Sequence, residues 1–432
     1  MYYGWAVLAA SALTEMIALG VTSYAAGLFV IPIERELGLS RGAANSSIAF
    51  LFGGGILLAP LVGRLLDRYS ARSVMVCGAL ALSAAFAAIA STSSAAIMAA
   101  VLFVPGAFGF IAIGSLATAT LVSRWFYRRR GLALGIATVA TSGGGFVVVP
   151  LLSVAIASYG WRTTLVLEAF FISVVVSALV LLVIRNSPLD LALQAHPENS
   201  GRPSADLVLQ EIAGGRGKGI PFSRWSEILS SRNFWTIVIA PASVSALSQA
   251  IVITLAPYGA GLGFGAASSA LLISAFSVAA AVTKVTSGFL ADRLDRRLIM
   301  VLASLSMAAS FALLLSSVSY GAVLVSACLA GVALGGVLPS SAWLIASHFG
   351  APSFGAVMGW GYALTGLLTI LAVRFVGTMF DYAGNYRLAF LAFAVLSTSV
   401  AFAPLMVRNS SAKDLARRND AGATEAAERE SE

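Results

Sequence analysis

The chain has 432 residues, of which 59% are hydrophobic and only 11% are charged, and its mean hydropathy is +0.90. A soluble protein of this size carries roughly 25% charged residues, so this composition excludes a water-exposed surface over most of the molecule. The formal net charge of +8 arises from basic residues in the polar segments between apolar stretches. It therefore indicates a membrane protein with basic loops and does not indicate binding to nucleic acid.

Twelve apolar segments of membrane-spanning length follow one another along the chain. A helix needs about 20 residues to cross the hydrocarbon core, and backbone groups in lipid must bond within their own segment or within a closed barrel. These segments lack the alternation of polar and apolar residues that barrel strands have, so they predict helices. We place the spans at approximately 5–33, 43–63, 73–92, 96–123, 131–157, 163–184, 233–259, 268–290, 298–317, 320–347, 354–380 and 386–407.

A polar, proline-containing stretch divides the spans into two groups of six. We expect residues 1–184 to form an N-terminal six-helix bundle, 185–231 a cytosolic linker, 232–407 a C-terminal six-helix bundle and 408–432 a disordered cytosolic tail. Most of the 27 Lys and Arg residues fall in loops on the side of this linker. By the positive-inside rule, both termini of this multi-pass protein then lie in the cytosol. The composition and the short outer loops favour a bacterial inner membrane.

One charged motif occurs once in each half of the chain. Residues 63–72 read Gly-Arg-Leu-Leu-Asp-Arg-Tyr-Ser-Ala-Arg, and residues 288–297 read Gly-Phe-Leu-Ala-Asp-Arg-Leu-Asp-Arg-Arg, so both fit G-x-L-x-D-R-x-x-x-R. The pair Trp161-Arg162 recurs as Tyr386-Arg387 at the same offset. Two charged landmarks in register indicate a duplicated half-chain, which is typical of two-lobed carriers.

The repeated motif resembles the cytosolic loop signature of the major facilitator superfamily. Three segments are similar to its monocarboxylate transporter and oxalate/formate antiporter branch: Gly4-Trp5-Ala6-Val7, residues 124–137, and Tyr159-Gly160-Trp161-Arg162. The resemblance implies an all-α integral membrane protein with twelve transmembrane helices in two pseudo-symmetric six-helix bundles. It implies alternating-access transport of a small, monocarboxylate-like organic anion, either with protons or in exchange for another anion. We expect a monomer in the lipid bilayer, with no cofactor and no nucleic-acid partner.

The resemblance also assigns a role to the motif itself. Asp67 and Arg68 in the first copy, and Asp292 and Arg293 in the second, are expected at cytosolic helix ends. There they could pair with a neighbouring helix and act as a conformational latch. The alternative is an ordinary basic loop, which the duplication at identical spacing disfavours.

Lys284 is the strongest candidate for a substrate-binding residue. It lies eight residues before Asp292, about 12 Å along a helix, too deep to reach water easily. A charge at that depth costs about 2.5–3.5 kcal/mol on insertion scales, so a functional role is the default expectation. In the resembling branch, an arginine four residues before the motif glycine binds the substrate carboxylate, and Lys284 stands four residues before Gly288. A structural ion pair with Glu15 is the alternative.

Glu15, inside the first span, is the candidate for proton coupling. Burial of a carboxylate favours its protonated form, as a proton carrier requires. The resembling monocarboxylate carriers place an aspartate four residues before the basic residue of span 8, where this chain has Ala280. Their span-1 lysine is also missing from the segment 22–24. Any coupling role therefore moves to Glu15, which could alternatively pair with Lys284.

Other polar residues within spans are weaker candidates. Arg374 could draw anions into an outward vestibule, or could pair with Asp381 near the surface. Glu168 is expected to hold the outer loop in place. Further candidates for the substrate site are polar or aromatic residues in spans predicted to surround a central cavity: Gln249, Tyr258, Thr118 and Trp343.

Three other functions are alternatives to a carboxylate carrier. An exporter of drugs or amphiphilic metabolites would carry a glycine–proline motif in the fifth span, to which the glycines at 143–145 and Pro150 are only loosely similar. A membrane enzyme is disfavoured because His196 and His348 have no metal-ligand spacing, and no nucleophile motif or paired carboxylates occur. A membrane sensor would be favoured by a large soluble appendage, and we expect none from this sequence.

Overall fold

The structure is a computed structural model that describes residues 2–126, 130–186, 230–290 and 295–406. Within this part of the chain, twelve helical segments are long and apolar enough to cross a membrane, as the sequence predicts. They run Gly4–Leu37, Arg41–Leu66, Ala71–Ser91, Ala95–Val122, Gly135–Tyr159, Trp161–Val183, Arg232–Gly261, Ala266–Ser287, Arg297–Ser316, Tyr320–Val337, Trp360–Ala383 and Arg387–Met406.

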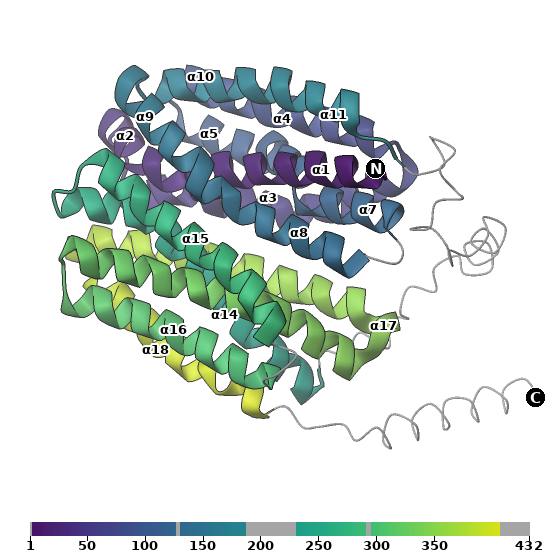
Figure 1. Cartoon of the computed structure of the whole chain (residues 1–432). Coiled ribbons are helices and arrows are strands. Elements are labelled where there is room, and N and C mark those ends of the chain that lie inside the picture. The colour runs from purple at the N-terminus through teal and green to yellow at the C-terminus, as the bar shows by residue number, and fades with distance from the viewer. Residues whose placement is uncertain (1, 127–129, 187–229, 291–294, 407–432) are drawn as a thin grey trace, which may run out of the picture.

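Figure 1 shows the spans as two bundles of roughly parallel helices, lying one against the other along their length. The first bundle, purple to teal, consists of α1 Gly4–Leu19, η1 Gly20–Tyr24, α2 Ala26–Leu37, α3 Arg41–Arg68, α4 Ala71–Ser91, α5 Ala95–Val101, η2 Leu102–Gly106, α6 Ala107–Ile113, α7 Ser115–Trp125, α8 Arg130–Gly143, η3 Gly144–Val148, α9 Val149–Tyr159, α10 Trp161–Phe171, η4 Ile172–Val176 and α11 Ser177–Val183. The second, green to yellow, consists of α14 Arg232–Gly261, α15 Ala266–Leu290, α16 Arg296–Ser316, α17 Tyr320–Ala383, α18 Arg387–Ala401 and η7 Ala403–Met406. We call them the first and second lobes.

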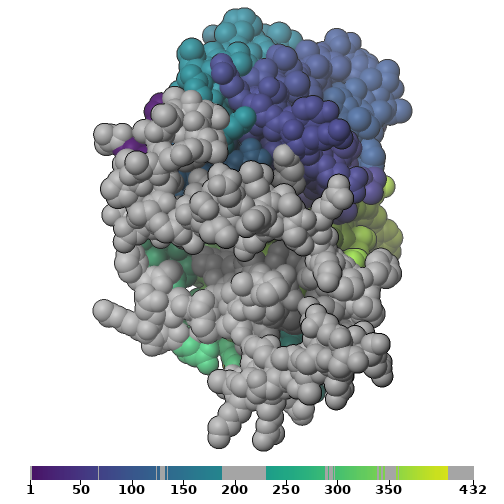
Figure 2. Space-filling model, turned by 90° about the vertical axis from the view of Figure 1, so that its right-hand side faces the viewer, coloured from purple at the N-terminus to yellow at the C-terminus, as the bar shows by residue number. Residues whose placement is uncertain are grey.

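The molecule has two ends. We call the end that carries Tyr2, near the N-terminus, the terminal face. There the Tyr2 hydroxyl donates to the Trp125 carbonyl at 2.6 Å, and the Trp125 indole donates to the Arg185 carbonyl at 2.9 Å. At the opposite end, the distal face, Arg162 donates to the carbonyls of Ala90 and Thr92, both at 2.7 Å. Figure 2 views the molecule from the terminal face, with the first lobe above the second.

Helix α17 contains both the tenth and the eleventh span, which the sequence predicted as separate helices. Its start and its end lie at the same face, because Tyr320 packs on Phe264 near the end of α14 and Phe380 packs on Tyr386, whose ring meets Tyr258 of the same helix. The two spans therefore run in opposite directions, and the chain reverses between them while its backbone stays helical.

Glycines let helices of the site approach closely. A Cβ added at Gly144 would lie 2.7 Å from the Met16 carbonyl oxygen, so the fifth span presses directly on the first. A Cβ at Gly335 would lie 2.6 Å from the Ala280 carbonyl oxygen, so α17 presses on α15 one turn before Lys284. Such small-residue contacts bring helices together in membranes, where the hydrophobic effect does not. They fix the positions of the two helices that carry Glu15 and Lys284.

The outer surface of the bundles is apolar, as contact with lipid requires. Large side chains are exposed on both lobes, among them Leu57 at 67%, Leu182 at 72% and Val395 at 60%. The interior is packed with small and aromatic residues, including fully buried Phe276 and Phe311. Both lobes thus expose large apolar side chains, which fits lipid as the solvent of the fold.

Candidate functional site

Glu15 lies on α1 and is almost completely buried, with 3% of its surface exposed. Its carboxylate accepts a hydrogen bond from the Ser115 hydroxyl of α7 and lies beside Thr118 on the same helix. Thr118 in turn donates to the Ser11 carbonyl at 3.1 Å, which joins α7 to α1 one turn before Glu15. The carboxylate is therefore held on the inner side of the first lobe by hydroxyls of the fourth span.

Lys284 crosses from the second lobe to the first. Its ammonium donates to the Thr138 carbonyl at 2.9 Å, the Thr141 hydroxyl at 2.8 Å and the Ser142 hydroxyl at 3.0 Å, all on α8. A lysine ammonium has three N–H donors, and these three acceptors satisfy them. All three acceptors are neutral, so they solvate the ammonium without cancelling its charge.

Glu15 and Lys284 interact electrostatically across the boundary between the lobes but do not form a contact ion pair. Among the described residues, the ion pairs within 4.0 Å are Arg41 with Glu34 and Arg162 with Glu36. A negative charge on the first lobe thus faces a positive charge on the second, each held by neutral partners.

Tyr362 on α17 is a member of this region that sequence reasoning missed. Its side chain is 66% exposed, and its phenol interacts electrostatically with Glu15 of the first lobe. Ser115, Thr141 and Ser142 were missed as well, because a search for charges in spans does not find neutral hydroxyls.

A second contact between the lobes closes the distal end. The two oxygens of the Asp381 carboxylate accept from the backbone N–H groups of Arg41 at 2.8 Å and Gly42 at 2.9 Å. The Arg41 guanidinium donates to the Tyr386 hydroxyl at 2.7 Å and stacks over the Phe380 ring at 4.4 Å from its centre. Burial raises the pKa of Tyr386 to about 12, so the phenol stays neutral. We call this group the distal seam.

Arg374 belongs to the distal seam and not to the surroundings of Lys284. Its Nη1 donates to the Gly42 carbonyl at 2.9 Å and to the Ser46 hydroxyl at 2.6 Å, both on α3 of the first lobe. The alternative pairing with Asp381 is not present, because that carboxylate bonds the backbone at the start of α3.

The remaining candidates fall in different places. Gln249 donates to the Ser23 carbonyl at 3.3 Å, across the boundary between the lobes. Tyr258 packs edge-on against Tyr386 and Phe390 in the distal part of the second lobe, away from Lys284. Arg68 is exposed at the end of α3. The side chains of Trp343 and Asp67, and the whole of Asp292 and Arg293, lie outside the described residues, so the latch remains a prediction.

Glu168 does not hold the outer loop, contrary to expectation. It is 5% exposed, and neither carboxylate oxygen has a hydrogen-bond partner among the described residues. Arg162, six residues earlier, has that structural role instead, because it bonds Glu36 at 2.7 Å as well as the carbonyls of Ala90 and Thr92 at the end of α4. Among the described residues, no group of three or more His, Cys, Asp or Glu could hold a metal ion.

Known proteins resemble this chain in both sequence and fold. The Major Facilitator Superfamily model matches residues 11–271 and 242–430. The uncharacterised MFS-type transporter YcxA of Bacillus subtilis is 27% identical over 178 residues, covering 40% of this chain and 43% of YcxA. Human monocarboxylate transporter 11 is 24% identical over 234 residues, covering 54% of this chain and 45% of that protein. The matched segments thus span less than half the length of these relatives.

Solved structures with low sequence identity share the fold. A bacterial homologue of the human lysosomal transporter Spinster superposes with a TM-score of 0.71 at 14% identity, covering 96% of this chain and 98% of that one. The xylose transporter XylE of E. coli has a TM-score of 0.70 at 14% identity, covering 95% and 99%. The family match and these folds describe transporters and not enzymes. The chain therefore belongs to the major facilitator superfamily of membrane transporters.

Proposed function

We propose that this transporter carries small organic anions, with carboxylates as the favoured class, through the space between its lobes. The observation that supports the proposal is the Lys284 ammonium, which reaches across the lobe boundary and has no carboxylate of the described residues within 4.0 Å. Lys284 is half-buried, and the bonds that its ammonium makes within the described chain go to neutral oxygens. Such a cation attracts an anion, since charge-assisted bonds are about twice as strong as neutral ones. A cargo carboxylate would replace one or more of the α8 acceptors.

The position of Lys284 links cargo binding to movement of the lobes. Its three bonds to Thr138, Thr141 and Ser142 tie α15 to α8. A carboxylate that takes over those donors would loosen that tie, whereas the distal seam would still hold the lobes together at the other end. Cargo would thus favour one arrangement of the lobes over the other, as alternating access requires. With the termini in the cytosol, the distal seam would close the outer side.

Glu15 is the proposed proton carrier. It is buried, it lies on the inner face of the first lobe, and it interacts with Lys284 on the other lobe. Protonation would remove the charge that opposes an incoming anion and would leave Lys284 as the dominant charge. In this proposal Gln249, Thr118 and Tyr362 shape the cargo site around Lys284, and Arg374 serves the distal seam.

The test is uptake of a panel of labelled carboxylates into proteoliposomes. Lys284→Gln should abolish uptake of the transported anion, and Lys284→Arg should retain it, because the positive charge persists. Thr286→Val is the matched control, since Thr286 is an exposed hydroxyl on the same helix that bonds only its own turn. Uptake of a neutral or cationic amphiphile in place of any carboxylate would favour an exporter of amphiphiles and reject the proposal.

A further inference from the structure

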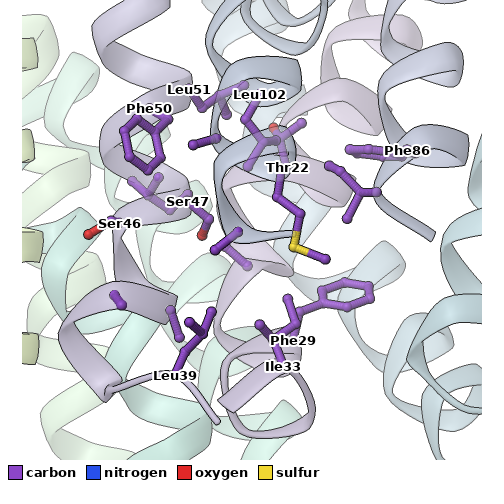
Figure 3. Close-up of a pocket in the computed structure, with 18 of the residues that line it drawn as sticks. Thr22, Phe29, Ile33, Leu39, Ser46, Ser47, Phe50, Leu51, Phe86 and Leu102 are labelled. Atoms are coloured by element: carbon purple, nitrogen blue, oxygen red, sulfur yellow. The ribbon is translucent and has the colours of Figure 1, made fainter. Parts of the chain in front are cut away.

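A cavity of about 340 Å³ is lined mainly by residues of the first lobe (Figure 3). Its walls come from the first, second, third, fourth and sixth spans. They are almost entirely apolar, with Phe29, Ile33, Ile48, Phe86, Met98 and Leu102 among the lining residues. Neither Glu15 nor Lys284 lines it. The volume is at the lower end of the range for pockets that hold small molecules.

One residue of the second lobe completes the wall, and among the described residues that line the cavity it is the only charged one. This residue is Arg374. Within the described part of the chain, its guanidinium donates through Nη1 alone, to the Gly42 carbonyl and the Ser46 hydroxyl. A guanidinium has five N–H donors in a planar fork, so Nε and Nη2 remain available to a carboxylate. No carboxylate of the described chain lies within 4.0 Å of it.

Arg374 and Ser46 lie together at the cavity, because the guanidinium donates to the Ser46 hydroxyl. Ser47 of α3 and Thr22 of η1 are further polar residues of the lining, and Phe29 and Phe86 face the cavity from other elements (Figure 3). Arg374 and Ser46 thus form a polar, positively charged rim at one place in a mainly apolar wall. That distribution matches a ligand with an anionic head and one hydrocarbon chain, and it does not match a wholly polar ligand.

We infer that this cavity binds a single-chain anionic amphiphile of the fatty-acid type, with the carboxylate at Arg374 and the chain among the apolar walls. Each buried methylene contributes about 0.8 kcal/mol, so a medium-length chain supplies most of the affinity and the head supplies selectivity. Arg374 lies on the other lobe and would leave the cavity if the lobes parted at the distal seam. The ligand therefore stabilises the closed seam, since it binds that arrangement best.

This inference is independent of the proposed cargo, because it uses none of the residues around Lys284. The test measures binding of dodecanoate and of dodecanol to the purified full-length protein in phosphatidylcholine nanodiscs by calorimetric titration. Ala99→Phe fills the cavity. Ala84→Phe is the matched control, on an exposed position of α4 that does not line the cavity. Arg374→Gln removes the cation at the rim.

We expect dodecanoate to bind more tightly than dodecanol. Ala99→Phe should weaken both ligands by about tenfold or more, which corresponds to about 1.4 kcal/mol. Ala84→Phe should leave both affinities unchanged, and Arg374→Gln should abolish the preference for dodecanoate. Undiminished binding in Ala99→Phe would show that the ligand sits elsewhere. Equal affinity of the unaltered protein for both ligands would overturn the role given to Arg374.

Two further measurements test whether the ligand has a single hydrocarbon chain and whether it stabilises the closed distal seam. Phosphatidylglycerol should fail to displace bound dodecanoate, because a two-chain lipid does not fit a cavity of this size; displacement would reject the single-chain assignment. Dodecanoate should shorten the distance between spin labels placed at Tyr159 and Tyr382, two exposed positions at the distal ends of different lobes. An unchanged or longer distance would show that the ligand does not stabilise the seam.

Discussion

The carboxylate of Asp381 accepts a hydrogen bond from the backbone N–H of Arg41, and so caps the first turn of a helix in the other lobe. The first four N–H groups of a helix lack partners within it, and negative charge is favoured there. Ser40 caps the same helix from within the chain by accepting from the Ala43 N–H at 3.2 Å. Asp381 satisfies two further donors, which makes the start of α3 a contact between lobes.

Neutralising Asp381 should therefore open the distal end. A hydrogen bond to a charged group contributes about 1.5–3 kcal/mol, and the exposure of Asp381 reduces this toward the lower end. We expect Asp381→Asn to shift the balance toward an open distal end by about tenfold. The measurement is the distance between spin labels at Tyr159 and Tyr382, recorded by electron paramagnetic resonance in a background with Cys77→Ser and Cys328→Ser. The variant should show a larger fraction of molecules with a long distance between the labels.

Asp295→Asn is the control for that substitution. Asp295 also accepts from a backbone N–H at a helix start, that of Arg297 at 2.9 Å, but the helix it caps is its own α16. Its loss should leave the distal distances unchanged. If Asp381→Asn gave the same distances as Asp295→Asn, the distal seam would not control opening.

The distal seam should not respond to pH in the physiological range. Burial raises the pKa of Tyr386 from an ordinary value near 10 to about 12. The phenol is therefore neutral in both open and closed forms below about pH 10, and its contribution is lost only as the pH rises from about 10 to 12. Label distances at the distal end should be constant from about pH 6 to pH 9. A transition within that interval would assign the titration to another group of the seam.

The crossing of the first and fifth spans should tolerate no side chain at Gly144. A Cβ there would meet the Met16 carbonyl at 2.7 Å and the Gly20 nitrogen at 2.8 Å. Overpacking of this kind costs about 1–3 kcal/mol, so Gly144→Ala should lower the thermal unfolding midpoint by several degrees. Gly135→Ala, on α8 with open space around it, should be neutral or slightly stabilising. Equal midpoints for the two variants would contradict the close crossing.

Glu15→Gln separates coupling from binding. The variant should lose uptake driven by a pH gradient, because the amide cannot take up a proton, and should keep exchange of internal for external anion. Uptake into liposomes with and without a pH gradient, and counterflow from preloaded liposomes, measure the two activities. Retained gradient-driven uptake would assign the proton to a different group, and Asp295→Asn should leave both activities intact.

The fold was predictable because the features that indicate it can be read directly from the order of residues in the sequence. Span length, the repeated motif and the basic loops depend on composition and spacing, and the twelve spans are confirmed. The depth of each residue in the membrane stays a prediction from its position along a helix. The partner of each side chain was not predictable, because it depends on how a helix is rotated and on which helix faces it.

Arg374, Glu168 and Tyr362 illustrate that difference. The charges of Arg374 and Glu168 within spans indicate a role for each, but the first residue bonds α3 and the second has no hydrogen-bond partner among the described residues. Tyr362 carries no charge, so nothing in its sequence context distinguished it from a lipid-facing tyrosine. Only the packing of α17 brings it within range of Glu15.

Binding of the transported carboxylate to Lys284 variants is the most direct test of the account. Calorimetric titration of the anion identified by uptake should show a loss of about a hundredfold or more in affinity for Lys284→Gln, about 2.7 kcal/mol, and near-normal affinity for Lys284→Arg. Thr286→Val should bind like the unaltered protein. Full affinity in Lys284→Gln would contradict the claim that this ammonium anchors the cargo.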